Sequence, residues 1–228
     1  MAQRSSLPEG SRRVTPRGPA RAAFEEYDFY GYGMREDVQK LLKQLEAEGL
    51  KHDSAETEHS RKLLNLESAT AEIIALLLLI AGVRNLLEIG TSNGYSTIWL
   101  ASTIGPRGGR LTSIDRDAGK HAMAHENLTA VDLLHYVDLV LGDATEIAAL
   151  LPGPFDCAFF DADRVSAPKQ LDLLLPKLSL PALLLADNAT SHPDQIAGYL
   201  ARVEVIKGIS HTIIPVGKGL SVAYLPSL

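Results

Sequence analysis

The chain has 228 residues, of which 46% are hydrophobic and 22% charged, enough for one globular domain with a sizeable core. Its formal net charge of −6 excludes the broad cationic surface that nucleic-acid binding requires. The single cysteine, Cys157, excludes an intramolecular disulfide and indicates a reducing compartment, so we expect a cytoplasmic protein. The longest apolar segment, residues 69–83, contains Glu72 and is shorter than the roughly 20 residues that cross a bilayer, which predicts no membrane association.

The first 60 residues divide into two parts. Residues 1–20 are basic and rich in Ser, Pro and Gly, and they lack the amphipathic face of a transit peptide, so we predict a flexible N-terminal arm. Residues 21–60 predict a helical extension whose main helix ends at Gly49, followed by a charged, solvated stretch. The apolar positions at helical spacing are Met34, Val38, Leu41, Leu42 and Leu45.

A second helix is predicted from Ser68, as N-cap, to Gly82. After it, the buried strand Leu86–Ile89 leads into a turn with glycine at both ends, Gly90 and Gly94, and then into a helix over 95–104. This order points free backbone N–H groups and the positive end of a helix at an anionic ligand. The turn therefore indicates a nucleotide-type cofactor site, with an ordinary strand-to-helix turn as the alternative.

From residue 86 onward, strand-like and helix-like segments alternate, which predicts a mainly parallel sheet with helices on both faces. The connection between the last two strands, which contains Gly217, Lys218 and Gly219, is too short for a parallel crossover, so these strands should form an antiparallel hairpin. The predicted strands are 86–89, 110–114, 137–141, 155–160, 182–186, 211–215 and 220–225. The predicted helices between them are 95–104, 118–131, 145–151, 169–178 and 194–203.

Polar residues follow four of these strands, at the edge where parallel sheets bind ligands. Asp115 is suited to bind ribose hydroxyls or to cap the next helix, and Asp143 to meet an adenine amino group or to cap its helix. Asp161, Asp187 and Asn188 offer only oxygen ligands, which favour Mg²⁺, Mn²⁺ or Ca²⁺. The alternative is that the last two merely satisfy backbone groups at a strand end.

Taken in order, the motifs resemble the S-adenosylmethionine-dependent O-methyltransferases, and most closely the cation-dependent catechol and caffeoyl-CoA type with its bacterial relatives. They are Leu87–Ser96, Asp115, Gly142–Ala144, Asp161–Asp163 and Asp187-Asn188, followed by the terminal hairpin. The resemblance implies a methyltransferase domain over residues 61–228, with the Rossmann-like class I fold. Relatives of this type are commonly dimers, so it also implies a homodimer.

The resemblance implies the site residues one by one. Asp161, Asp187 and Asn188 would hold a divalent cation that chelates the acceptor. The cofactor, S-adenosylmethionine, would contact Glu88 (supporting the turn or the amino group), Gly90, Thr91, Ser92, Gly94, Tyr95, Ser96, Asp115, Gly142, Asp143, Ala144 and Asp161. The expected reaction is methyl transfer to a hydroxyl of a small, aromatic, catechol-like acceptor.

One departure from the family pattern concerns catalysis. Arg164 stands where the family often has a lysine that acts as a base; arginine stays protonated, so it could stabilise a phenolate but not remove its proton. We therefore take His192 as the candidate general base, with a surface histidine as the alternative, and count Arg164 and Asp161 as the other catalytic residues. Three other functions stay open: a cofactor-binding module without catalysis, a metal-independent methyltransferase and, least compatible with the glycine spacing, an NAD-dependent dehydrogenase.

Overall fold

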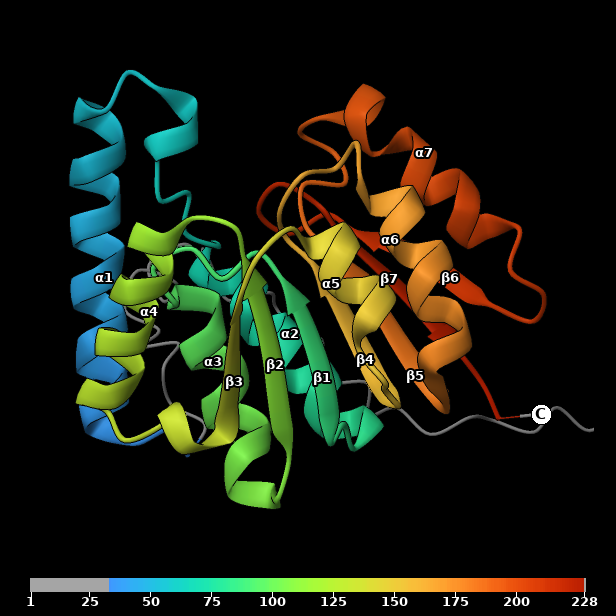
Figure 1. The fold of residues 1–228 in the computed structure, drawn as a ribbon, viewed down its shortest axis with the longest axis horizontal. Helices are drawn as coiled ribbons and strands as arrows, with labels where there is room; N and C mark the ends of the chain where they lie inside the picture. Colours follow the sequence, from blue (N-terminus) through green and yellow to red (C-terminus); the bar gives the residue numbers. More distant parts are fainter. Residues whose placement is uncertain (1–32, 228) are drawn as a thin grey trace, which may run out of the picture.

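The computed structural model describes residues 33–227 (Figure 1). The predicted arm over residues 1–20 and the first part of the predicted extension lie outside the described residues. The helices are α1 (Glu36–Ala55), α2 (Ser68–Ala81), α3 (Tyr95–Ile104), α4 (Ala118–Ala130), α5 (Ala144–Leu150), α6 (Ala167–Leu174) and α7 (Pro193–Glu204). The strands are β1 (Asn85–Ile89), β2 (Arg110–Asp115), β3 (Val137–Leu141), β4 (Phe155–Phe160), β5 (Leu178–Ala186), β6 (Ser210–Ile214) and β7 (Leu220–Leu225).

The strands form one seven-stranded sheet in the order β3-β2-β1-β4-β5-β7-β6. The pairs among β1 to β5 are parallel, whereas β7 runs antiparallel to both β5 and β6. This confirms the predicted α/β fold with its C-terminal hairpin. The chain leaves β1 toward β2 and β3 on one side and then returns to place β4 on the other, so the strand order reverses between β1 and β4. Ligands of open parallel sheets bind at such a reversal.

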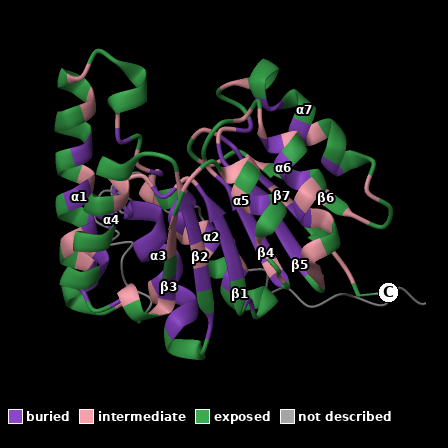
Figure 2. Cartoon of the chain, viewed as in Figure 1, coloured by how far each residue is buried: buried purple, intermediate pink, exposed green. Residues whose placement is uncertain are grey.

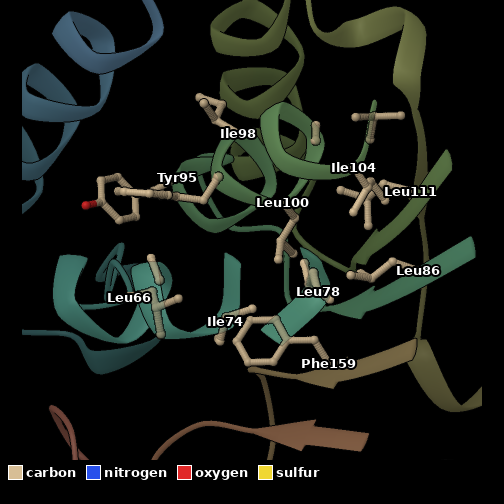
Figure 3. Packing of buried hydrophobic residues seen from close by; sticks show 14 of the residues in the cluster. Leu66, Ile74, Leu78, Leu86, Tyr95, Ile98, Leu100, Ile104, Leu111 and Phe159 are labelled. Atoms are coloured by element: carbon tan, nitrogen blue, oxygen red, sulfur yellow. The ribbon is translucent and has the colours of Figure 1, made fainter. Parts of the chain in front are cut away.

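Helices cover both faces of the sheet, and two apolar clusters fill the space beneath them. One cluster joins α1, α2, α3 and the end of α4 to the sheet, and the other lies under α5, α6 and α7. Buried residues accordingly run along the strands while the outer helix faces are exposed (Figure 2). In α3 nine of the ten residues are buried, and Leu100 points toward Leu78 of α2 (Figure 3).

The prediction that the first helix ends at Gly49 is wrong, because α1 continues to Ala55. Gly49 is a buried position inside the helix, where a Cβ atom would lie 2.5 Å from Nδ2 of Asn65. That amide nitrogen donates a hydrogen bond to the carbonyl oxygen of Leu45 at 2.9 Å. The glycine therefore makes room for a neighbouring segment and does not end the helix.

The predicted N-cap residue of the second helix differs from the observed one by one position. Glu67, not Ser68, is the N-cap residue of α2, while Gly82 ends the helix with φ +68°, as expected. No helix within residues 33–227 has the length and the apolar content needed to span a bilayer.

Candidate active site

A cavity of about 870 Å³ runs along the carboxyl edge of the sheet, where the strand order reverses. Its walls come from the ends of β1 to β5, from residues 59–66 and from the β6–β7 turn. Of the predicted site residues, Glu88, Gly94 and Asp187 are absent from the cavity wall. Those that line it are Gly90, Thr91, Ser92, Tyr95, Ser96, Asp115, Gly142, Asp143, Ala144, Asp161, Arg164, Asn188 and His192.

The glycine turn requires glycine for two different reasons. Gly90 has φ +110°, and a Cβ atom there would lie 2.3 Å from the carbonyl oxygen of Asp161. Gly94 has φ +86° and packs closely on Ala124 of α4. The first glycine thus brings the ends of β1 and β4 together beneath the cavity, and the second seats α3 against α4.

Glu88 is completely buried at the end of β1 and its carboxylate accepts three short hydrogen bonds. The hydroxyls of Ser96, Thr97 and Ser113 each donate to it at 2.6 Å. Burial raises the pKa of Glu88 to about 7, against the opposing effect of the three hydroxyls. Because Glu88 ties the first turn of α3 to β2 and lies behind the cavity wall, its geometry fits support of the turn and not direct contact with an amino group.

Asp115 lies at the end of β2 and organises the backbone on both sides of it. One carboxylate oxygen accepts from the N–H of Ser92 at 2.7 Å, and the other from the N–H of Asp117 at 2.9 Å. The cap of α4 is Asp117, which accepts from the N–H groups of Gly119 and Lys120. Asp115 is therefore not the helix cap considered from the sequence, and each of its oxygens keeps a lone pair available to a hydroxyl in the cavity.

Asp143 does cap its helix. Its Oδ1 atom accepts hydrogen bonds from the backbone N–H groups of Thr145 and Glu146, in the first turn of α5. These bonds hold the pKa of Asp143 below the usual range. Next to it, Gln170 reaches the same part of the cavity from α6. Its Nε2 atom donates to the hydroxyl of Thr145 at 3.3 Å. Gln170 is not among the predicted site residues, because nothing local in the sequence distinguishes a helix glutamine that turns inward.

The carboxylates of Asp161 and Asp187 follow two strands that lie side by side. Phe160 of β4 pairs in register with Ala186 of β5, and the N–H of Asp187 donates to the carbonyl oxygen of Phe160 at 3.1 Å. Asn188 follows directly, so the parallel register brings the three predicted metal ligands to one corner of the sheet edge, with Asp161 and Asn188 on the cavity wall and Asp187 buried behind it. Asp187 is only 3% exposed, and its Oδ1 atom is buried without a hydrogen-bond partner among the described residues.

Burial is the main electrostatic influence on the two carboxyl groups of this corner. Burial first, and then the charge of Asp187, raise the pKa of Asp161 well above its ordinary value. Burial raises the pKa of Asp187 to about 6, against the hydrogen bond from the backbone N–H of Asn188. A bound cation would offset the cost of ionising these two buried carboxyl groups.

The donor chemistry of the corner fits a hard divalent cation. The Asn188 amide donates from Nδ2 to the Asp187 carboxylate at 2.8 Å and accepts at Oδ1 from the hydroxyl of Ser191 at 3.1 Å. These two hydrogen bonds fix the orientation of the amide and therefore of its oxygen. No group of three or more His, Cys, Asp or Glu side chains within residues 33–227 could hold a metal ion. The candidate set here has two carboxylates and one amide, all oxygen donors, as Mg²⁺ or Ca²⁺ would require.

Besides Asp161, the predicted catalytic residues are Arg164 and His192, and both line the cavity. Arg164 donates from Nε to Oε1 of Gln195 at 3.0 Å, which turns its guanidinium along the first turn of α7. His192 immediately precedes that helix, and its Nδ1 atom lies 2.9 Å from the hydroxyl of Ser191. Both residues line the cavity, so the structure brings them to the same wall as Asn188.

Two further parts of the cavity wall are not among the predicted site residues. Residues 59–66 cross over the glycine turn, where the Ser92 hydroxyl donates to the carbonyl of Leu63, and Lys120 Nζ donates to that of Lys62. Lys218, in the β6–β7 turn, lines the cavity beyond Asn188. Its position between two glycines of a tight hairpin is the one signal that could have drawn attention to it.

A mainly parallel sheet that ends in an antiparallel hairpin, with a glycine-turn cavity along its carboxyl edge, defines a Rossmann-like methyltransferase fold. A sequence profile described as O-methyltransferase matches residues 35–199. The chain belongs to the O-methyltransferase family.

Among curated relatives, the chain is similar to two bacterial catechol O-methyltransferases. It is 36% identical to that of Niastella koreensis over 122 residues, 51% of this chain and 54% of that protein. It is 34% identical to that of Mycobacterium tuberculosis over 116 residues, 49% of this chain and 52% of that protein. The chain thus spans about half the length of the curated relatives it matches.

Solved structures resemble it over a larger part of the chain. The O-methyltransferase TomG from Streptomyces achromogenes, solved with SAM, has a TM-score of 0.72 at 25% identity, over 87% of this chain and 94% of that one. An O-methyltransferase from Bacillus cereus in complex with SAH has a TM-score of 0.69 at 22% identity, over 82% and 90%. The second likeness concerns the fold alone.

Proposed function

We propose that this protein transfers a methyl group from S-adenosylmethionine to a hydroxyl of a small, catechol-like aromatic acceptor, with the help of a divalent cation. The observation that carries the proposal is the cavity that joins the glycine turn to the corner of the paired carboxylates Asp161 and Asp187. The catechol O-methyltransferase names of the two bacterial relatives support this class of acceptor.

The cofactor side of the cavity has groups suited to each part of S-adenosylmethionine. The turn from Gly90 to Ser96, at the N-terminus of α3, would hold the methionine part, and Asp115 would accept from the ribose hydroxyls. Gly142, Asp143 and Ala144 would border the adenine. When bound, the cofactor supplies an electrophilic methyl group on a positively charged sulfur.

On the acceptor side, Asp161, Asp187 and Asn188 would hold the cation, which lowers the pKa of a coordinated hydroxyl. His192 would accept the hydroxyl proton, and Arg164 would stabilise the resulting phenolate. The acceptor oxygen then forms a bond to the methyl carbon as the bond between that carbon and sulfur breaks, which leaves a methyl ether and S-adenosylhomocysteine. The cavity's contribution is to hold the reacting atoms in line and exclude water.

Cofactor binding is tested by thermal unfolding with S-adenosylmethionine, S-adenosylhomocysteine or NAD, each with Mg²⁺ or with EDTA. A ligand of the native state at a hundredfold excess over its Kd stabilises by about 2.7 kcal/mol. We expect a rise in Tm with either sulfur compound and none with NAD, with a further rise on addition of Mg²⁺. No rise with either sulfur compound would contradict the proposal.

One observation favours a second candidate function, a binding module without catalysis. Arg164 stands where a proton-accepting lysine is common in the family, and its Nε atom donates a hydrogen bond to Gln195. An arginine at this position cannot serve as the base. Turnover of any acceptor excludes this alternative.

We also propose that the protein is a homodimer, because dimers are common among the O-methyltransferases that it resembles. Analytical ultracentrifugation of the full chain tests this proposal.

A further inference from the structure

The β6–β7 turn holds Lys218 over the acceptor side of the cavity. The turn lies between Ile214 and Leu220, and in it Gly217 and Gly219 flank Lys218 with positive φ, +53° and +88°. A Cβ atom at Gly217 would lie 2.2 Å from the Glu67 carboxylate, and one at Gly219 would lie 2.5 Å from the hydroxyl of Thr190. The turn is therefore wedged between the start of α2 and the segment after β5, and only glycine fits beside the lysine.

Hydrogen bonds fix the backbone of Lys218 from both sides. Its carbonyl oxygen accepts from the N–H groups of Thr190 and Ser191, at 2.9 and 3.2 Å, and from the Thr190 hydroxyl at 2.8 Å. Its own N–H donates to the Glu67 carboxylate at 3.2 Å. Because Thr190 and Ser191 lie just beyond Asn188, these bonds anchor the lysine to the loop that bears the candidate metal ligands.

The ammonium of Lys218 has donor capacity left for a ligand. It lies 3.5 Å from a carboxylate oxygen of Glu67, and the side chain is 38% exposed, on the cavity wall. An ammonium carries three N–H donors, and Glu67 occupies one direction. Its charge also reaches the metal corner, since it lowers the pKa values of both Asp161 and Asp187.

We propose that Lys218 is a further catalytic residue: its ammonium donates a hydrogen bond to the ionised acceptor oxygen and stabilises the negative charge until the methyl group is transferred. This inference rests on the proposed function. The hydroxyl proton goes to a base, and the oxygen's electron pair forms the new bond to carbon while the carbon–sulfur pair returns to sulfur. Lys218 keeps its three protons throughout, so its part is electrostatic.

Arg164 directs its Nε donor to Gln195, and the donors of its two terminal nitrogens remain for a ligand. Lys218 is a second cation of the cavity wall and comes from a different element, the β6–β7 turn beside Glu67 at the start of α2. The charges of Lys218 and Arg164 both lower the pKa values of Asp161 and Asp187, so an acceptor oxygen near these carboxylates would have two cations nearby. Such an arrangement favours the ionised acceptor before methyl transfer begins.

The test uses 4-nitrocatechol, whose anion absorbs visible light and so reports its own ionisation. The full chain is saturated with S-adenosylhomocysteine, which has no methyl group to transfer, at one fixed Mg²⁺ concentration. The absorbance of bound nitrocatechol is titrated with pH for the wild type, Lys218→Met, Lys218→Arg and Lys207→Met. Lys207 is an exposed lysine after α7 and serves as the matched control.

We expect the pKa of bound nitrocatechol to rise by about one unit in Lys218→Met, a tenfold change in the ionisation equilibrium. Lys218→Arg should restore most of the difference, and Lys207→Met should match the wild type. Should Lys218→Met fail to fold, Lys218→Gln takes its place. Equal titration of the neutral variant and the wild type overturns the inference, as does wild-type-bound nitrocatechol that titrates like the free compound. Failure of the proposed function appears separately, as absence of thermal stabilisation by S-adenosylhomocysteine.

Discussion

At the scale of single residues, the buried carboxylate of Glu88 makes stability depend on pH. Its pKa is about 7 in the folded protein, against an ordinary value of 4.5. The folded state therefore holds a proton that the unfolded state has lost over this range. The stabilisation is fully present below about pH 4.5 and is lost as the pH rises through 7.

We predict that the free energy of unfolding contributed by this residue falls by about 3 kcal/mol between these limits. In Glu88→Gln, which cannot titrate, this component of the pH dependence should vanish. The measurement is urea unfolding at intervals from pH 4.5 to 8. The difference between the two proteins reports the titration of Glu88 together with its effect on the pKa of Asp161. Parallel curves for the wild type and the variant would contradict the assignment.

Gly90 offers a second prediction at this scale. Gly90→Ala places a Cβ atom 2.3 Å from the Asp161 carbonyl, in addition to the strain of a positive φ. Gly208→Ala is the matched control, because Gly208 also has a positive φ, +82°, but has open space around it. We expect about 1 kcal/mol of destabilisation in the control and clearly more in Gly90→Ala, together with loss of S-adenosylhomocysteine binding. Chemical denaturation and the ligand-induced rise in Tm measure the two effects.

At the scale of elements, α1 shows how a contact overrides a helix propensity. Replacement of a helix glycine by alanine normally stabilises, by up to about 1 kcal/mol. At Gly49 we predict destabilisation instead, because the new Cβ would displace Asn65 and break its hydrogen bond to Leu45. In the Asn65→Ala background the same substitution should become stabilising. The four proteins form a double-mutant cycle in the free energy of unfolding, and additive effects would contradict this interpretation of α1.

The elements themselves are largely predictable from the sequence, for a physical reason. Buried strands and amphipathic helices have local patterns, so the predicted bounds of β3, β4, β7 and α3 agree with those in the structure. The end of α1 is not predictable in this way, because glycine is the usual helix terminator and only the tertiary contact with Asn65 reveals its other use. The start of β5 at Leu178 also differs from the prediction, since Pro181 interrupts the strand pattern.

At the scale of the whole molecule, the parallel topology explains which site residues the sequence can indicate. Parallel strands bring their carboxyl ends to one edge, so the pattern of strands and helices is enough to assign Asp115, Asp161 and Asp187 to that edge. The strand order cannot be assigned in this way, because it depends on pairings distant in sequence. Lys218 and Gln170 are not among the predicted site residues for the same reason, because each reaches the cavity only through the tertiary arrangement of its element.

The metal corner gives a prediction at this scale, since it joins the ends of two strands. Asp187→Asn removes one of the two buried charges, so the apo protein should become more stable, while the additional stabilisation by Mg²⁺ should disappear. Thermal unfolding with Mg²⁺ and with EDTA measures both effects. Asp172→Asn, at an exposed carboxylate of α6, is the control and should leave the response to Mg²⁺ unchanged.

The central claim, methyl transfer to a catechol-like hydroxyl, is tested most directly by the product. The full chain is incubated with S-adenosylmethionine bearing an isotopically labelled methyl group and a set of catechols, with Mg²⁺ or with EDTA, and the products are analysed by mass spectrometry. We predict a labelled methyl ether and an equal amount of S-adenosylhomocysteine, both strongly reduced by EDTA and by Asp187→Asn. Binding of S-adenosylhomocysteine without a labelled ether from any catechol would contradict the account and favour a binding module.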